Sequence, residues 1–214
     1  MATDKNHTGG LEARIVDAAR QLFIERGFVG TSMSDIASRA GINRPTLHYY
    51  FRTKERMFDA VFGGIVGTLV PRVKDIVLQP DRPIGERVAS VVDAYYDVFG
   101  ANPGLPMFIV REMHRDFDGV VRTIMEMRLG QYIESVRQGL QGEMDSGRLR
   151  QVPMRYLFLT FYSMLTMPFV AGNLCRTVLL DDGETFADLL AGWKPYIVDA
   201  MERLLQYCVL NQIP

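Results

Sequence analysis

Residues 41–51, GINRPTLHYYF, gather side chains that can donate hydrogen bonds to an anion. Amides at helix N-termini and Arg, Lys, Ser, Thr, Tyr and His side chains bind phosphate, and arginine can also bond guanine through two donors. The major groove of DNA admits one α-helix, whose first turns reach the base edges. This stretch and its flanks therefore predict a DNA contact surface made of the following residues: Ser32, Ser34, Arg44, Pro45, Thr46, His48, Tyr49, Tyr50 and Lys54.

Local signals around this stretch predict two short helices joined by a tight turn. The segment 32–35, SMSD, is a capping box that opens one helix, and Gly41 ends it. Asn43 caps the next helix, in which Leu47 and Phe51 lie four residues apart on one apolar face. A helix-turn-helix has this form. The alternative is a tight corner of an α-helical bundle that carries exposed tyrosines for no functional reason.

The charge distribution favours a polyanionic partner for the N-terminal part. The 214 residues carry a net charge of −1, but residues 1–56 hold nine Lys and Arg against six Asp and Glu. A basic N-terminal part followed by an acidic remainder is the asymmetry expected when one end of a protein binds nucleic acid.

Helical periodicity continues through the rest of the chain, and no strand alternation is evident, so we predict an all-α protein. The predicted helices lie at about 54–78, 84–99, 105–115, 119–144, 153–175 and 184–210. We assign residues 1–10 to a flexible polar tail, 11–56 to a helix-turn-helix DNA-binding domain and 57–214 to an effector-binding and dimerisation domain. The first residues lack an apolar signal region, and the longest apolar run, 157–172, is shorter than the ~20 residues of a membrane span. A cytoplasmic protein without a membrane partner is expected.

Residues 11–58 resemble the DNA-binding domain of the TetR family of bacterial transcriptional regulators. The resemblance rests on Ala18, Leu22, Phe23, Gly27, Thr31, Asp35, Ile36, Ala37, Ala40, Gly41, Leu47, Tyr49, Phe51 and Lys54. It implies a homodimeric, all-helical repressor that binds a palindromic operator in double-stranded DNA and releases it when a small molecule binds the C-terminal domain. The sequence departs from the family at His48, where Tyr is frequent, and at Tyr50, where His is frequent, which puts the operator preference in doubt.

The C-terminal part is rich in methionine and aromatic residues, which suit an irregular apolar pocket. We predict an unidentified small apolar or aromatic effector in contact with Phe62, Phe108, His114, Met125, Phe161 and Tyr162. Simple core packing is the alternative for the apolar residues, and a surface or capping role for His114. Gly63, Gly64 and Gly67 weaken the helix that begins at Lys54, either as a hinge or to allow close packing. An activator or nucleoid-associated relative without an effector is the alternative function.

Apolar stripes on the last two predicted helices suggest a homodimer closed by a four-helix bundle. The predicted interface residues are Phe161, Leu165, Met201, Leu204, Leu205 and Cys208. Packing within one chain is the alternative. The two cysteines, Cys175 and Cys208, have no metal-ligand spacing and are expected to be structural thiols rather than a redox pair. No catalytic or metal-binding motif is present, so we expect neither an enzyme nor a metal or other cofactor.

Overall fold

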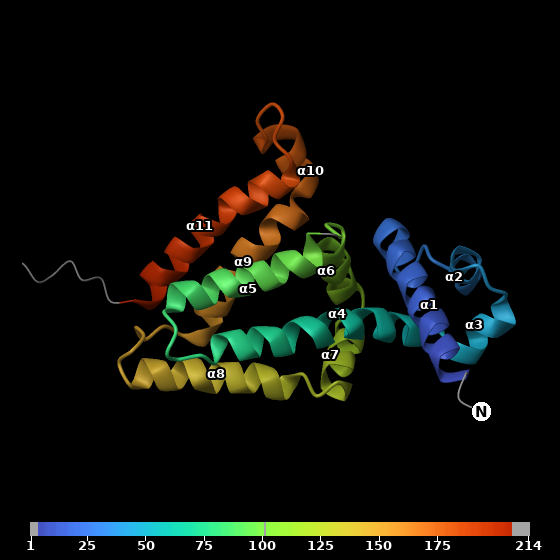
Figure 1. The fold of residues 1–214 in the computed structure, drawn as a ribbon, viewed down its shortest axis with the longest axis horizontal. Helices are drawn as coiled ribbons and strands as arrows, with labels where there is room; N and C mark the ends of the chain where they lie inside the picture. The colour runs from blue at the N-terminus through green and yellow to red at the C-terminus, as the bar shows by residue number, and fades with distance from the viewer. Residues whose placement is uncertain (1–3, 101, 207–214) are drawn as a thin grey trace, which may run out of the picture. The chain divides into compact units, whose positions relative to one another are not determined.

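Helices form all the regular structure in the described part of the chain, residues 4–100 and 102–206 of a computed structural model (Figure 1). Their bounds are α1 Asp4–Arg26, α2 Met33–Ala40, α3 Arg44–Tyr50, α4 Lys54–Val77, α5 Ile84–Phe99, α6 Leu105–Arg115, α7 Phe117–Glu126, α8 Gly130–Asp145, α9 Met154–Val170, α10 Gly172–Leu174, the π-helix η1 Cys175–Leu179 and α11 Phe186–Leu205. The prediction of an all-α protein is confirmed.

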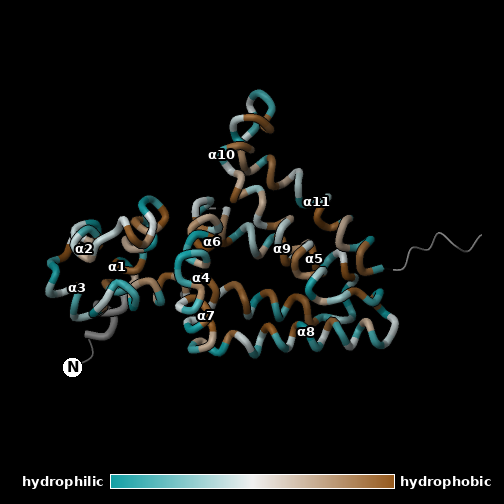
Figure 2. The backbone as a smooth tube through the Cα atoms, turned by 180° about the vertical axis from the view of Figure 1, so that it is seen from behind, coloured by the Kyte–Doolittle hydropathy of each residue, from teal (hydrophilic) through white to brown (hydrophobic). Residues whose placement is uncertain are grey.

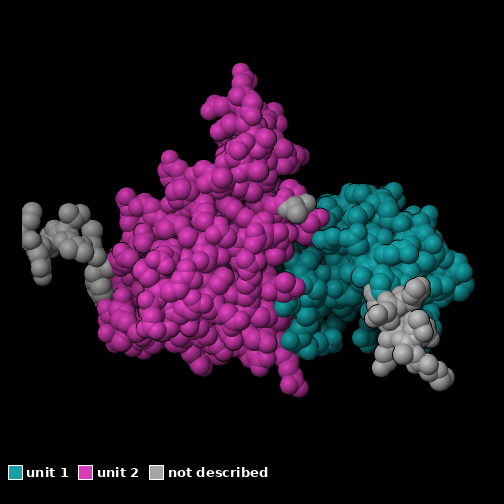
Figure 3. All heavy atoms as spheres, viewed as in Figure 1, with its two compact units in different colours: residues 1–67, 107–127 teal, residues 68–106, 128–214 magenta. Residues whose placement is uncertain are grey.

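Two compact units divide the chain (Figure 3). The first takes in residues 1–67 and 107–127, and the second takes in 68–106 and 128–214. The predicted DNA-binding segment, 11–56, lies in the first unit, together with the start of α4 and with α6 and α7.

Aromatic rings form the core of the first unit. Phe23 of α1 stacks on Phe108 of α6 with ring centroids 5.9 Å apart, and Phe58 of α4 meets Phe108 edge-on at 5.8 Å. Edge-on and offset aromatic pairs add to the stabilisation from burial alone. These rings therefore fix α1, α4 and α6 against one another within this unit.

In the second unit, α5 packs along α11, and α9 completes the core. The Tyr95 and Thr166 hydroxyl oxygens are 3.2 Å apart, and the Tyr95 ring meets Phe169 edge-on. The Trp193 indole Nε1 donates to the Met164 carbonyl at 3.0 Å. Hydrophobic and hydrophilic positions alternate along the helices of this unit (Figure 2), as expected for helices with one buried face.

Several helix boundaries differ from the sequence prediction. The predicted helix 153–175 ends at Val170, and after Ala171 the chain continues as α10 and the π-helix η1 to Leu179. The predicted helix 119–144 is broken between α7 and α8, where Arg128 adopts a left-handed backbone with φ 55°. Gly130 directly follows that break, and glycine is a local signal for a helix boundary that the sequence prediction passed over. At the other end, α1 begins at Asp4, and residues 4–10, which we assigned to the tail, are helical. The apolar pattern starts only at Leu11, so periodicity gave no signal for these first turns.

Within the described residues, no single helix has the length and apolarity to cross a membrane; only α9 with the segment Gly172–Leu179, bent by 60°, meets those criteria as a pair.

The glycines of α4 differ in what surrounds them. A Cβ on Gly63 would lie 2.7 Å from the Met127 sulfur, and one on Gly67 would lie 2.8 Å from the Met127 methyl carbon. A Cβ on Gly64 would meet nothing within 4 Å. Of the two roles considered for these glycines, close packing therefore has a visible partner at Gly63 and Gly67.

We expect Gly64→Ala to raise the free energy of unfolding by about 0.5–1 kcal/mol, because alanine restricts the unfolded chain and favours the helix. Gly63→Ala should gain less or lose stability, because Met127 must move to admit the methyl group. Urea denaturation of both variants would measure the difference. Equal changes would show that the Met127 contact has no energetic weight.

Candidate nucleic-acid interface

Local hydrogen bonds fix the ends of α2. The Asp35 amide donates to the Ser32 hydroxyl at 3.1 Å, and the Ser32 amide donates to the Asp35 carboxylate at 2.9 Å, which is the predicted capping box. The Ser32 hydroxyl and amide together lower the pKa of the Asp35 carboxyl, so this carboxylate is ionised at neutral pH. At the other end, Gly41 has φ 68°, a left-handed conformation that glycine adopts without strain. These local interactions begin and end α2 as the sequence predicted.

The following helix, α3, is capped by Asn43, whose side-chain oxygen accepts from the Thr46 amide at 2.8 Å. Pro45 lies in the first turn, where its missing amide costs little. Leu47 is fully buried, and Phe51 directly after the helix is buried with it. One side of α3 thus packs against the core, and the other side is exposed.

The outward side of α3 carries the predicted contact residues. Tyr49 is 81% exposed, and the Tyr50 ring meets it edge-on at 5.4 Å. Arg44 and Pro45 are exposed, whereas Thr46 is half-buried. Ser32 and Ser34, at the start of α2, are exposed as well. The first unit therefore presents aromatic rings, hydroxyls and a guanidinium group on two adjoining helices.

His48 is within hydrogen-bonding distance of two nearby residues, Arg44 and Arg52. Arg44 Nε donates to His48 Nε2 at 3.3 Å, and His48 Nδ1 lies 3.2 Å from the Arg52 carbonyl oxygen. Because a carbonyl only accepts, both bonds together require a neutral ring with its hydrogen on Nδ1. In this arrangement His48 holds the Arg44 side chain by its Nε. The predicted His48 contact with phosphate stays a prediction.

Lys54, predicted to reach DNA from the start of α4, makes contacts inside the first unit. Its ammonium donates to the carbonyls of Phe28 and Thr31, both at 2.9 Å. It also lies 4.4 Å from the centre of the Phe28 ring. Two of its three donors are therefore engaged by the turn between α1 and α2. These contacts could not be predicted from residue types, because a carbonyl is present at every residue.

Ion pairing also holds α1 to α2. Arg39 of α2 donates through both terminal nitrogens to the Glu25 carboxylate of α1, at 3.0 and 2.9 Å. The Arg39 hydrogen bonds lower the pKa of the Glu25 carboxyl. Arg14 of α1 donates to the Ala40 carbonyl at the end of α2 at 2.9 Å. These contacts orient the helix pair that presents α3.

The predicted effector residues fall in both units. Phe62, Phe108, His114 and Met125 belong to the first unit, and Phe161 and Tyr162 belong to the second. Phe62 and Phe108 are buried among other rings, whereas Met125 and His114 are exposed. Hence no single unit gathers all of these side chains, and their role in effector binding stays a prediction.

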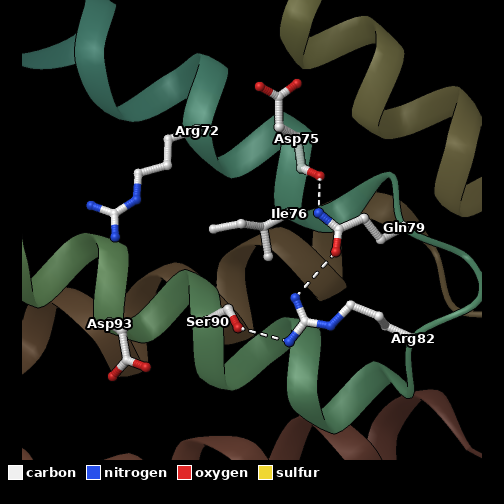
Figure 4. A pocket seen from close by; sticks show the side chains of 7 residues that line it. All are labelled: Arg72, Asp75, Ile76, Gln79, Arg82, Ser90 and Asp93. Atoms are coloured by element: carbon white, nitrogen blue, oxygen red, sulfur yellow. Dashed lines mark hydrogen bonds between the residues drawn. The ribbon is translucent and has the colours of Figure 1, made fainter.

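An open groove of about 580 Å³ lies in the second unit, and it is polar rather than apolar (Figure 4). It is lined by Arg72, Asp75, Ile76, Gln79, Arg82, Ser90 and Asp93. Arg82 donates to Gln79 and Ser90, and Arg72 pairs with Asp97 at 2.8 Å. Its arginines are thus paired with groups of the protein itself, and we assign no ligand to the groove.

The predicted dimer residues are mostly buried within one protomer. Leu165, Met201 and Leu205 are buried, and Phe161 and Leu204 are half-buried. Cys208 lies outside the described residues. The apolar side chains that α9 and α11 expose are different ones: Tyr156, Phe158, Leu159, Met167 and Tyr196. Helical periodicity identified a buried face, but it could not distinguish cover by the same chain from cover by a partner.

The capped pair α2 and α3, with its buried inner side and polar aromatic outer side, defines a helix-turn-helix protein. Residues 15–61 match the family model of the bacterial regulatory proteins of the tetR family.

Comparisons with individual proteins agree with this assignment. The chain is 32% identical over 109 residues to the HTH-type transcriptional repressor BdcR of Escherichia coli, a match that covers 51% of this chain and 55% of that protein. It is 25% identical over 174 residues to the probable HTH-type transcriptional regulator YttP of Bacillus subtilis, covering 78% of this chain and 80% of that protein. The chain spans about half or less of the length of the first curated relatives that it matches.

Solved structures share the fold along most of the chain. The fatty acid degradation regulator FadR of Bacillus halodurans superimposes with a TM-score of 0.66 at 20% identity, covering 88% of this chain and 94% of that one. FadR of Bacillus subtilis in complex with stearoyl-CoA also gives 0.66, at 18% identity, covering 87% of this chain and 97% of that one. At these identities the likeness concerns the fold alone.

Proposed function

We propose that the protein is a transcriptional repressor that binds a palindromic operator in double-stranded DNA as a homodimer and leaves it when a small apolar or aromatic effector binds. In this proposal residues 11–56 bind DNA and residues 57–214 bind the effector and the second protomer. The observation that carries it is the outer side of α3, where Arg44 is exposed and Tyr49 is 81% exposed above a buried Leu47. Two of the matched relatives are named as transcriptional repressors, which supports repression rather than activation.

Activation of transcription is the alternative, with or without an effector. It is favoured by the HTH-type transcriptional activator FasR of Mycolicibacterium smegmatis, which is 31% identical over 84 residues. The two functions use the same DNA contacts. Transcription in vitro from the protein's own promoter region, with and without the protein, separates them.

An apolar effector is supported by the interior of the second unit and by one structural neighbour. Tyr96 has a buried hydroxyl without a hydrogen-bond partner among the described residues, and its ring centre lies 6.1 Å from that of Phe169. Burial raises the pKa of Tyr96 to about 12, so the hydroxyl keeps its proton and can donate to a ligand. FadR of Bacillus subtilis, which has this fold, is in complex with stearoyl-CoA, a ligand with a long apolar chain. Long-chain acyl-CoA is therefore the first effector to test.

The homodimer is proposed to form through the outward sides of α9 and α11. Tyr156, Leu159 and Met167 of α9 are each more than half exposed, as is Tyr196 of α11. Two such helices from each protomer would form a four-helix bundle around a two-fold axis. This surface replaces the buried Leu165, Met201 and Leu205 as our proposed contact.

Loss of the Arg44 side chain tests the DNA contact directly. We expect Arg44→Ala to weaken operator binding by about 1–3 kcal/mol and to relax the preference at one base position, because arginine reads guanine with two donors. Tyr49→Phe should instead weaken binding to all DNA sequences alike, because a phosphate contact carries no base information. Fluorescence anisotropy with promoter DNA and with random DNA measures both. Equal loss on the two DNAs for Arg44→Ala would rule out its base contact.

A further inference from the structure

The turn between α1 and α2 is held from inside the first unit by the first side chain of α4. The Lys54 ammonium donates to the carbonyls of Phe28 and Thr31, each at 2.9 Å. The Thr31 hydroxyl in turn donates to the carbonyls of Leu22 and Gly27 at the end of α1. Thr31 is buried, and Ser32, the next residue, is the cap of α2. The position at which α2 starts therefore depends on this turn.

A second cation lies over the same phenylalanine ring. The Arg115 guanidinium, at the end of α6, is 4.1 Å from the centre of the Phe28 ring, and the Lys54 ammonium is 4.4 Å from it. Arg115 is itself held by the buried carboxylate of Glu112, with Nε and Oε2 2.5 Å apart, and lies 3.9 Å from the Asp116 carboxylate. Cations within about 6 Å of an aromatic ring are attracted to its face, and more strongly when they are removed from water.

We infer that Lys54 and Arg115 are positioning residues for DNA binding: together they clasp Phe28 and fix the turn from which α2 and α3 are presented. This inference rests on the proposed DNA-binding function. Lys54 acts here through the protein backbone and not through a phosphate. Arg115 joins α6 to the same turn, so a change in α6 would reach the start of α2 through one ring.

The salt dependence of DNA affinity separates positioning from phosphate contact. A cation that neutralises a phosphate releases counterions, which contributes about 0.9 to the slope of log affinity against log salt, or about 1.8 for both copies in a dimer. A positioning residue changes affinity and leaves that slope unchanged. Lys54→Met removes the charge and the donors but keeps most of the apolar stem.

We expect Lys54→Met and Arg115→Met each to weaken promoter binding by on the order of tenfold. Lys54→Met removes the hydrogen bonds to two carbonyls and a cation from the Phe28 ring, and Arg115→Met removes the other cation, so the turn becomes less stable in both. Neither variant should alter the salt slope. Arg122→Met, which removes one positive charge from an exposed position of α7 in the same unit, is the matched control and should leave affinity nearly unchanged. A fall in slope of about 1.8 for Lys54→Met would overturn the inference and assign Lys54 to a phosphate.

A measurement without DNA tests whether Lys54 and Arg115, through their contacts with Phe28, stabilise the turn between α1 and α2. The Thr31 amide donates to the Phe28 carbonyl, which is one of the two that Lys54 holds, and the Ile36 amide donates to the Ser32 carbonyl in the first turn of α2. Native-state hydrogen exchange at these two amides should accelerate about tenfold in Lys54→Met and Arg115→Met but not in Arg122→Met. Unchanged exchange would overturn the clasp.

DNA affinity and hydrogen exchange distinguish failure of the proposed DNA-binding function from failure of the positioning role of Lys54 and Arg115. If the wild-type protein bound no DNA, the proposed function would fail. Accelerated exchange in the variants would still show that Lys54 and Arg115 stabilise the turn between α1 and α2. If Lys54→Met did not fold, Lys54→Arg and Arg115→Met would carry the test. Lys54→Arg retains a cation with donors and should keep exchange within about threefold of the wild type. Exchange as fast in Lys54→Arg as in Arg115→Met would count against a role for the Lys54 cation.

Discussion

Replacing Glu143 with Gln is expected to lower the free energy of unfolding by about 3–5 kcal/mol, the usual cost of breaking a buried ion pair. Glu143 accepts from both terminal nitrogens of Arg87 at 2.8 Å, and the two residues are 5% and 2% exposed. Arg87 also donates to the Val77 carbonyl at the end of α4. Glutamine would leave the guanidinium buried without a countercharge. Urea denaturation followed by circular dichroism, at fixed protein concentration, measures the loss.

An exposed ion pair in the same unit provides the control. Arg72 and Asp97 are joined at 2.8 Å with side chains 48% and 62% exposed, so Asp97→Asn should cost no more than about 1 kcal/mol. The double variant Arg87→Met, Glu143→Leu should recover most of the loss, because apolar residues of similar size can replace a buried pair. If Glu143→Gln cost no more than Asp97→Asn, the pair would have no special role in joining α5 to α8.

Features that depend on neighbouring residues could be predicted from the sequence. The cap at Ser32, the glycine turn at Gly41 and the cap at Asn43 each use partners within five residues, and all three are present as predicted. The same holds for Leu47 and Phe51, whose spacing of four places them on one side of α3. Local chemistry was therefore sufficient to define the helix-turn-helix and its outer surface.

Features that depend on distant residues could not be predicted in this way. Phe108 stacks on Phe23, 85 positions away, and the Lys54 ammonium reaches carbonyls 23 and 26 positions away. Composition suggested that the ring would line a pocket, and the position of the lysine suggested that it would reach DNA. In both cases the partner is supplied by the tertiary fold.

The proposed interface between two protomers is the second place where a substitution should have a large effect. On α9, Tyr156, Leu159 and Met167 are spaced so that they share one side of the helix, and each is more than half exposed. On α11, Tyr196 is exposed, and so are Ala191 and Gly192 one turn earlier, small residues that allow a partner helix to approach closely. An apolar surface of this kind on two adjacent helices is typical of a contact with another protein.

We expect the double variant Leu159→Glu, Tyr196→Glu to be monomeric at micromolar concentration and to bind palindromic DNA at least 100-fold more weakly than the wild type. Four carboxylates would meet across a two-fold interface, where unpaired charges are costly to bury. A separated protomer also loses the high effective concentration at which the second half-site is bound. Analytical ultracentrifugation and anisotropy on promoter DNA measure the two effects.

Two further variants decide which surface forms the contact between protomers. The alternatives are the exposed residues of α9 and α11 and the buried residues Leu165, Met201 and Leu205. Ile133→Glu, on the exposed side of α8, adds a charge at another exposed apolar residue and should leave both assembly and DNA affinity unchanged. Leu205→Glu places a charge at a position only 2% exposed within one protomer, so it should lower the melting temperature by several degrees, whether or not it separates dimers. A protein that stays dimeric with Leu159→Glu and Tyr196→Glu, but dissociates without loss of thermal stability with Leu205→Glu, would place the contact on the buried stripe instead. That result would require α9 and α11 to rearrange on assembly, because a partner cannot contact Leu205 while the protomer's own helices cover it.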